Sequence, residues 1–410
     1  MTIHTTTAEA GLDAVRTGRF LAAVCDREPV AGLTHNFYRY PARFSPVFAR
    51  TAIELFTERG DLVFDGFMGG ATSLVEARIL GRNSLGTDIS ELAAFVARVK
   101  TTPLSDLELD RIAGWASSLD QHLNLHQPAN RAHQWIADGY QRNLNTVQAW
   151  PIRKLLELAL SRIAELETRS QQEFARCALL NCGQWALDCR SVIPSSREFR
   201  RKLQSVLAEM IVGAREYARL VAQADRESGN TEQQVPLCLH RSVAGVEHDA
   251  RVTSRGTPRL LLLSPPYPGV YMLYHRWKVQ GRRETPAPFW VANSLDGSGM
   301  AYYTLGDRKQ RKLKRYFTEI AEAFNSLAKI AGEESWVVQM VGFSNPAWQL
   351  PKYLQMLKRA GLTEMKFADL ANSRDGRLWR VVPNRKWFAA YQQTTQSTAR
   401  EVVLFHRRSR

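Results

Sequence analysis

Four consecutive residues near the middle of the chain could grip a flat ring that carries an amino group. Ser264, Pro265, Pro266 and Tyr267 follow the apolar run 260–263. The two prolines restrict the backbone, so a hydroxyl, a carbonyl and an aromatic ring are held with little freedom. Such a rigid group suits binding of a nucleobase. An ordinary strand followed by a proline-rich turn explains the same residues equally well.

A second stretch has the composition of a ligand-binding turn. The segment 61–65 predicts a short strand, and a glycine-rich turn, 66–72, follows it at once. Glycines allow a sharp turn and close approach of a ligand to the main chain. Asp88 lies 23 residues after Asp65, near the spacing of a carboxylate that binds ribose hydroxyls. Because the pyrophosphate fingerprint Gly-x-Gly-x-x-Gly is absent, an adenosine ligand without pyrophosphate is favoured over NAD, and a turn without any ligand is the alternative.

The elements around these residues predict an α/β fold. Strand, glycine-rich turn, helix and strand in succession form half of a Rossmann-like sheet, which binds ligands beyond the carboxyl ends of its strands. Further strands are predicted at 84–88, 235–241, 259–263, 336–341, 378–382 and 401–405, and helices at 47–57, 73–80, 311–331 and 347–360. Helical periodicity fills 105–234. We therefore expect an N-terminal arm or short helix (1–34), a catalytic domain (35–104 and 235–410) and a helical insertion (105–234).

Charge and cysteine content narrow the class of protein. Fifty-five Lys and Arg against forty Asp and Glu give a net charge of +15, which favours a polyanionic partner such as nucleic acid. No apolar run approaches the roughly 20 residues of a membrane span, and the N-terminus lacks the features of a secretion signal. Five scattered cysteines favour a reduced, cytoplasmic protein. The spacing of Cys177, Cys182 and Cys189 matches no zinc pattern, so buried small hydrophobes are expected and no metal is predicted.

Several arginines could contact phosphates, although a solvated helix face is the alternative for each of them. One group surrounds 189–202, and the other lies in and before a predicted polar loop at 281–284. The candidates are Arg190, Arg197, Arg200, Arg201, Arg276, Arg282 and Arg283.

With these pieces in place, the chain resembles the amino-methyltransferases of DNA. Three motifs carry the resemblance in order: 40–44 (Tyr-Pro-Ala-Arg-Phe), 65–72 with Asp88, and Ser264-Pro-Pro-Tyr267. The resemblance implies that S-adenosylmethionine is the cofactor and that double-stranded DNA is the substrate, with one base flipped out of the helix. The helical insertion 105–234 is then a possible DNA-recognition subdomain. The resemblance assigns cofactor binding to Tyr40, Pro41, Phe44, Asp65, Gly66, Phe67, Gly69, Gly70, Thr72 and Asp88, and catalysis to Ser264, Pro265, Pro266 and Tyr267.

Two departures and three alternatives accompany this resemblance. Gly66 replaces the family's usual Pro, and Ala71 stands where its last loop glycine is usual, which weakens cofactor binding if the position needs a positive φ. Serine before Pro-Pro-Tyr is commoner in cytosine-N4 enzymes, which favours that product over adenine N6. An RNA methyltransferase and a catalytically inactive nucleic-acid-binding relative are further alternatives. The expected setting is restriction–modification or another defence system, and the possible partner is a cognate restriction endonuclease or a defence-system protein.

Overall fold

The structure is a computed structural model that describes residues 14–26, 28, 30–40, 45–128, 133–228, 235–268, 276–281, 283–295, 311–381 and 400–409. Three residues that the sequence analysis assigns to the site, Pro41, Phe44 and Arg282, lie outside these ranges. Within them, no helix combines the length and the apolarity that crossing a bilayer requires.

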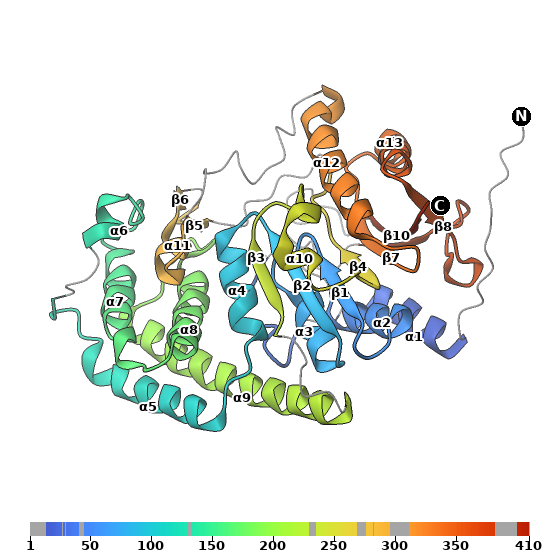
Figure 1. The fold of residues 1–410 in the computed structure, drawn as a ribbon. Coiled ribbons are helices and arrows are strands. Elements are labelled where there is room, and N and C mark those ends of the chain that lie inside the picture. Colours follow the sequence, from blue (N-terminus) through green and yellow to red (C-terminus); the bar gives the residue numbers. More distant parts are fainter. Residues whose placement is uncertain are drawn as a thin grey trace, which may run out of the picture.

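A mostly parallel sheet forms the centre of the molecule (Figure 1). Its strands are β1 (Leu62–Asp65), β2 (Asn83–Asp88), β3 (Leu237–His240), β4 (Leu260–Leu263), β7 (Trp336–Gly342), β8 (Leu362–Met365), β9 (Leu378–Val381) and β10 (Arg400–Arg408). They lie in the order β3-β2-β1-β4-β7-β10-β8, with β9 also paired to β10. β10 is antiparallel to β7, β8 and β9, and the pairs among β3, β2, β1, β4 and β7 are parallel. The predicted Rossmann-like α/β fold is confirmed.

Burial on both faces explains why β4 consists of four leucines. Leu260 and Leu262 pack with α1 (Ala14–Cys25) and α2 (Pro46–Phe56), whereas Leu261 and Leu263 pack with α12 (Lys314–Ile330) and α13 (Pro346–Arg359). A parallel strand covered on both sides has no polar face, so its sequence does not alternate. α3 (Thr72–Ile79) and α4 (Glu91–Thr101) follow β1 and β2.

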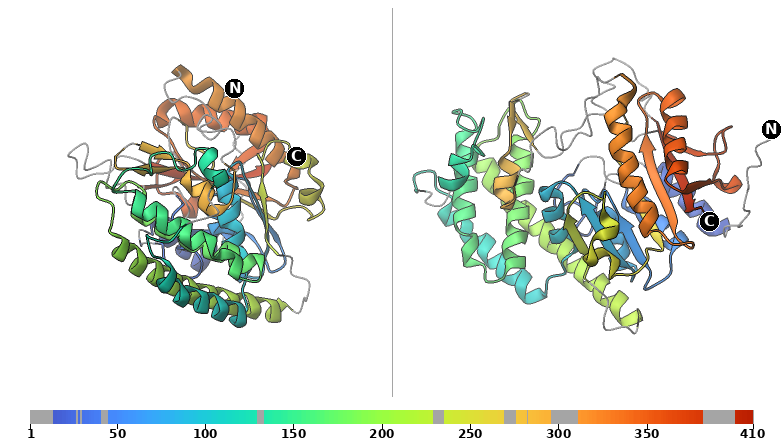
Figure 2. Two further views of the ribbon diagram at one scale, coloured as in Figure 1. Left: turned by 90° about the vertical axis from the view of Figure 1, so that its left-hand side faces the viewer. Right: turned by 45° about the horizontal axis from the view of Figure 1, so that its top comes forward.

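The segment 105–234 is helical where it is described, as its periodicity predicts. It contains α5 (Asp106–His122), α6 (His133–Ala137), α7 (Trp150–Ser161), α8 (Arg169–Leu187) and α9 (Ser196–Ser228). Capping boxes begin α5, at Ser105, and α8, at Thr168. These helices share one apolar cluster with α4 and with the aromatic residues Phe37, Tyr38 and Tyr40. The two views of Figure 2 show this helical part beside the sheet.

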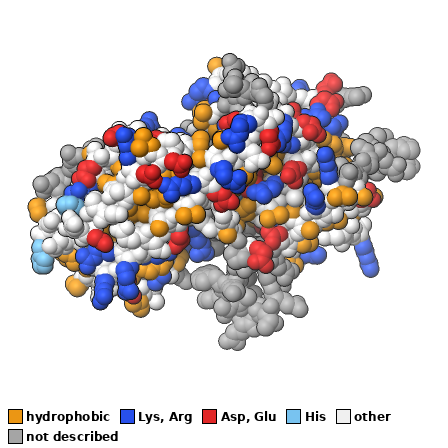
Figure 3. Space-filling view, turned by 90° about the horizontal axis from the view of Figure 1, so that it is seen from below, with side chains coloured by type: hydrophobic (Ala, Val, Ile, Leu, Met, Phe, Trp, Pro, Cys, Tyr) orange, Lys and Arg blue, Asp and Glu red, His pale blue; other side chains and the backbone are white. Residues whose placement is uncertain are grey.

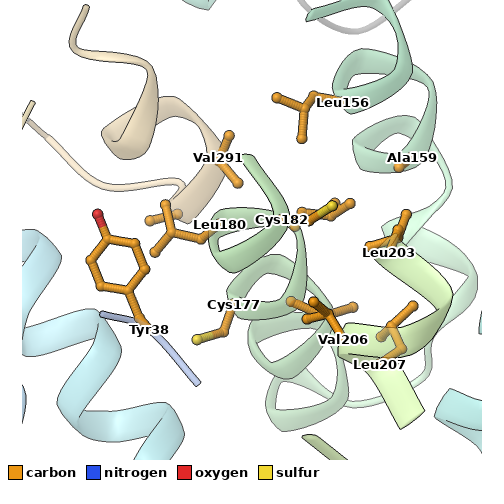
Figure 4. Close-up of a cluster of buried hydrophobic side chains, with 14 of the residues drawn as sticks. Tyr38, Leu156, Ala159, Cys177, Leu180, Cys182, Leu203, Val206, Leu207 and Val291 are labelled. Atoms are coloured by element: carbon orange, nitrogen blue, oxygen red, sulfur yellow. The ribbon is translucent and has the colours of Figure 1, made fainter. Parts of the chain in front are cut away.

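Two of the three cysteines considered above are buried small hydrophobes, as expected. α8 lies in the middle of the cluster, with Cys182 facing Leu203 and Cys177 on the side of Tyr38 (Figure 4). Burial raises the pKa of the Cys177 thiol to about 12. The expectation is wrong for Cys189, which is exposed in the turn after α8 and has a positive φ of 56°.

The polar loop predicted around 281–284 is instead part of a hairpin. β5 (Trp277–Val279) and β6 (Arg283–Thr285) pair, α11 (Ala287–Ala292) follows, and all three pack against the helical part. Asp188 fixes the hairpin by accepting a hydrogen bond from the Lys278 amide (2.9 Å). The apolar side chains of 277–292 therefore belong to the same cluster as the helices of 105–234.

Short helical turns complete the described part of the chain. They are α10 (Ala250–Thr253) and the 3₁₀ turns Ile163–Glu165, Val246–His248, Arg311–Leu313 and Ala368–Leu370. The helix predicted from 311 is interrupted at its start, because Lys312 and Leu313 have positive φ values of 69° and 48°. Its regular part begins at Lys314.

Candidate active site

The glycine-rich turn leaves the end of β1 and is held to α3 by Asp65. This buried carboxylate accepts hydrogen bonds from the Phe67 amide (3.0 Å) and from the Ser73 hydroxyl. Burial, together with the charge of the neighbouring Asp88, raises the pKa of Asp65 to about 7, although the two hydrogen bonds lower it. Both Asp65 oxygens thus hold the turn itself in shape.

Asp88 stands at the end of the neighbouring strand β2 and reaches the same turn. Its Oδ2 accepts a hydrogen bond from the Gly69 amide (3.0 Å), and its Oδ1 accepts one from the Ser90 amide (2.8 Å). Burial raises its pKa to about 6, although these bonds and the nearby His240 lower it. A carboxylate can accept about four hydrogen bonds, so two positions remain for the hydroxyls of a ligand.

The glycines of the turn are required by close neighbours. A Cβ at Gly69 or Gly70 would lie 3.1 Å from Tyr40, so the Tyr40 ring packs directly on the turn. Gly69 also has a positive φ of 42°. A Cβ at Gly66 would lie 2.9 Å from a methyl group of Val243. That contact explains why glycine suits this position, where the resemblance leads us to expect proline.

Ala71 keeps the left-handed conformation that glycine would provide. Its φ and ψ are 59° and 28°, and it immediately precedes α3. The conformation costs an alanine about 1–2 kcal/mol. Its fully buried methyl group packs with Met68 and Leu74, and burial of one such group returns roughly 0.8 kcal/mol. Alanine therefore adopts the left-handed conformation here at a small net cost.

A buried lysine that sequence reasoning missed ties the turn to the aromatic segment before it. The Lys100 ammonium donates hydrogen bonds to the carbonyl oxygens of His35 (3.0 Å), Tyr38 (3.4 Å) and Gly70 (3.0 Å). Its position in the last turn of α4 resembles that of an ordinary surface lysine, so no signal in the sequence indicated this role. Lys100 fixes the segment that carries Tyr40 against the glycine-rich turn.

The residues of the turn fit an adenosine-type cofactor. Within the described part of the chain, the buried Thr72 hydroxyl has no hydrogen-bond partner. The first amides of α3 lack intrahelical acceptors and carry the positive end of the helix dipole, which suits a carboxylate. Phe67 and Gly69 are half-buried, Gly69 contacts Asp88, and the two residues offer apolar and main-chain surface to a ligand.

The Ser264–Tyr267 segment lies beside this turn because β4 is the parallel neighbour of β1, with Val63 opposite Leu260. Two hydroxyls fix its backbone: Tyr316 donates to the Pro266 carbonyl (2.7 Å), and Ser344 donates to the Pro268 carbonyl (3.2 Å). No described residue donates a hydrogen bond to the Pro265 carbonyl. That oxygen is therefore available to an amino group. The half-buried Ser264 hydroxyl is hydrogen-bonded to the Tyr267 hydroxyl, and its lone pairs can still accept a hydrogen bond.

Tyr267 is held at its ring and at its hydroxyl. A Cβ at Gly342 would lie 3.0 Å from the ring, and the hydroxyl donates to Glu401 Oε1 (2.8 Å). Glu401 is buried and in turn accepts a hydrogen bond from Arg380 (2.7 Å). Burial and the Glu401 charge raise the pKa of Tyr267, so its phenol remains neutral. Sequence reasoning missed Glu401 and Arg380, which belong to the distant β10 and β9.

The candidate DNA-contacting arginines form two groups. Arg283 is exposed on β6, Arg276 is half-buried before β5, and Arg190 lies 4.8 Å above the Trp185 ring beside the same hairpin. The second group lies in the first turns of α9: Arg197 and Arg201 are exposed there, and Arg200 donates to the Leu123 carbonyl (3.2 Å).

Comparison with known proteins gives matches over part of the chain. Residues 24–97, from the end of α1 through the glycine-rich turn and into α4, match the family model described as DNA methylase. The type II methyltransferase M.MvaI of Kocuria varians is 39% identical over 82 residues, which cover 19% of this chain and 18% of that protein. M.MjaII of Methanocaldococcus jannaschii is 32% identical over 78 residues, covering 19% and 15%. M.BsoBI of Geobacillus stearothermophilus is 41% identical over 56 residues, covering 13% and 11%.

These matches span less than a fifth of the length of each curated relative. The matched family segment contains Asp65, the glycine-rich turn and Asp88, and the sheet around it has the Rossmann-like order described above. The family uses S-adenosylmethionine as its methyl donor. Over residues 24–97 the chain is therefore similar to the N4/N6 amino-methyltransferases of DNA.

Proposed function

We propose that this protein transfers a methyl group from S-adenosylmethionine to the exocyclic amino group of a base flipped out of duplex DNA. The observation that carries the proposal is the placement of the cofactor turn and of Ser264–Tyr267 at the carboxyl ends of two adjacent parallel strands, β1 and β4. A methyl donor and an acceptor ring held there would lie side by side, and alignment of the two is the main requirement of the reaction.

Each residue has a role in this proposal that follows from its contacts. Asp88 would bind the ribose hydroxyls, the turn 66–72 would surround the methionine part, and the cofactor supplies a methyl group on a sulfonium. Tyr267 would stack on the flipped base. The Ser264 hydroxyl and the Pro265 carbonyl would accept hydrogen bonds from the amino group, which keeps its nitrogen lone pair directed at the methyl group.

We favour cytosine N4 as the methylated atom, and adenine N6 is the second candidate. The serine at position 264 supports this choice, because its hydroxyl is a shorter and weaker acceptor than the side chains of Asp or Asn. Digestion of methylated duplex DNA to nucleosides, followed by mass spectrometry, tests it. N4-methylcytosine is the expected product; N6-methyladenine alone would overturn the base assignment, and methylation of structured RNA alone would overturn the DNA assignment.

We propose further that the arginines beside the β5–β6 hairpin contact DNA phosphates. The β5–β6 hairpin lies in the upper left part of Figure 1, whereas α9 runs along the lower side of the molecule. The charges of α9 and its neighbour α5 pair there, for example Arg215 with Asp106 and Asp110. Figure 3 shows acidic and basic side chains interspersed over that lower face.

Charge-reversal variants of the two groups test this part of the proposal. Arg190→Glu with Arg283→Glu should weaken DNA binding and flatten its salt dependence, since each lost phosphate contact reduces the slope by about 0.9. Arg197→Glu with Arg201→Glu removes the same charge from α9. A larger effect of the α9 pair would move the DNA contacts to α9.

A defence setting with a cognate endonuclease remains part of the proposal; co-purification from the native host is its test.

A further inference from the structure

A second basic surface lies on the opposite flank of Ser264–Tyr267 from the hairpin. α12 precedes and α13 follows β7, so both helices begin at the carboxyl edge of the sheet, where β4 also ends. The hydroxyl of Tyr316 in α12 binds the Pro266 carbonyl (2.7 Å), and Ser344 just before α13 binds the Pro268 carbonyl (3.2 Å). The first turns of these two helices are thereby joined directly to the proposed catalytic segment.

Three lysines and the exposed Trp348 cover these first turns, and the buried Phe317 ring lies under the Lys352 ammonium. We define the α12–α13 surface as Lys312, Lys314, Phe317, Trp348 and Lys352. The Lys352 ammonium lies 4.1 Å from the centre of the Phe317 ring and 5.9 Å from that of Trp348, and it donates to the Lys312 carbonyl (3.3 Å). Trp348 is 38% exposed, which is a large fraction for a tryptophan.

The lysines of this surface have no acidic partners among the described residues. None of them forms an ion pair with Lys312, Lys314 or Lys352, whereas the adjacent Arg315 is paired with Glu319 (2.6 Å). The pKa of Lys352 is lowered by burial and by the charge of Lys312, so the two ammonium groups repel each other. The amino ends of α12 and α13 add the positive ends of two helix dipoles.

We infer that the α12–α13 surface binds the DNA strand that flanks the flipped base, with its lysines on phosphates and Trp348 stacked on a base exposed by flipping. Interleaved lysines and exposed aromatics are the features with which proteins hold unpaired nucleic acid strands. Lysine charges left without acidic partners suit phosphate, whose binding releases counterions. The inference rests on the proposed function and extends it to a second contact with DNA, on the other flank of the target base.

Salt dependence separates the lysines from general charge effects. The variant Lys312→Gln/Lys314→Gln is compared with Lys358→Gln/Arg359→Gln, which removes two exposed charges from the other end of α13. With a fluorescently labelled duplex, the first variant should reduce the slope of log K against log salt by about 1.8, and the control should leave it unchanged. Equal changes in both variants, or none in the first, would refute the inference. S-adenosylmethionine binding should be the same in all forms.

Trp348 is tested by a readout that does not depend on charge. Trp348→Ala should lower affinity for a duplex with a mismatched target base about fivefold or more at every salt concentration, with the slope unchanged, and Trp348→Phe should restore most of it. Unchanged affinity of Trp348→Ala would remove the stacking contact from the inference. If the lysine and tryptophan effects occur with structured RNA but not with duplex DNA, the partner assignment is wrong. Methyl transfer by the wild type is measured in parallel, so that failure of the enzymatic proposal is distinguished from failure of this surface.

Discussion

Two carboxylates at the glycine-rich turn, the buried Asp65 and the half-buried Asp88, have different roles. Asp65 uses both oxygens to hold the turn, whereas Asp88 has acceptor capacity left after its bonds to Gly69 and Ser90. Burial raises the pKa of Asp65 to about 7 and that of Asp88 to about 6, so the protonation of both groups changes near neutral pH. Cofactor binding should therefore depend on pH.

Affinity for S-adenosylmethionine should increase as the pH rises from about 5 to about 7 and then level off. Ribose hydroxyls donate to the charged form of Asp88, so binding favours loss of its proton. Asp65 and His240 are the other titratable groups that face Asp88. Calorimetry across this range checks the prediction, with Asp88→Asn as the control. Parallel pH profiles of the wild type and Asp88→Asn would show that another group governs the dependence.

The ring and the hydroxyl of Tyr267 should contribute separately. Tyr267→Phe keeps the stacking surface and loses one hydrogen bond to Glu401, so we expect methyl transfer to fall less than tenfold. Tyr267→Ala removes the ring as well, and stacking is worth about 1–3 kcal/mol per base, so a loss of tenfold or more is expected. Single-turnover rates at saturating cofactor compare the two. Equal losses would assign the whole effect to the contact with Glu401.

At the scale of elements, several residues of the candidate site could be placed from the sequence because they lie at the carboxyl ends of predicted strands. Asp65, Asp88 and Ser264 could be placed from apolar runs and turn residues alone, since carboxyl ends of parallel strands meet at one edge. Lys100, Glu401 and Arg380 could not, because each acts through contacts with segments far away in sequence. β8 was not predicted since only Leu362 in it is buried, and a strand with one buried residue has no apolar run.

The close contact between Gly66 and Val243 can be tested by mutating both residues. Gly66→Ala places a Cβ 2.9 Å from Val243, and we expect it to destabilise the fold by about 1–3 kcal/mol. Val243→Ala removes the methyl group in the way, so the double variant should be more stable than the sum of the single effects predicts. Denaturant titration of the four proteins completes the cycle. Additive effects would contradict the proposed contact.

At the scale of the whole molecule, the sheet and the helical part meet around the aromatic segment before the cofactor turn. Tyr38 and Phe37 pack among the helices, and Tyr40 packs on Gly69 and Gly70. Trp277 of the hairpin donates to the Tyr38 hydroxyl (3.2 Å). The segment therefore connects the proposed DNA-contacting hairpin with the proposed cofactor site. Periodicity revealed the helices but not this connection, because it depends on tertiary packing.

Methyl transfer from labelled S-adenosylmethionine to duplex DNA tests the central claim most directly. The wild type should label duplex DNA. Tyr267→Ala and Ser264→Ala should lose most of this activity while calorimetry shows unchanged cofactor binding, because both residues lie at the end of β4 and outside the cofactor turn. Non-specific DNA binding should also persist, since phosphate contacts elsewhere supply it. Near-wild-type turnover in both variants, or no transfer to DNA by a wild-type protein that binds the cofactor, would contradict the account.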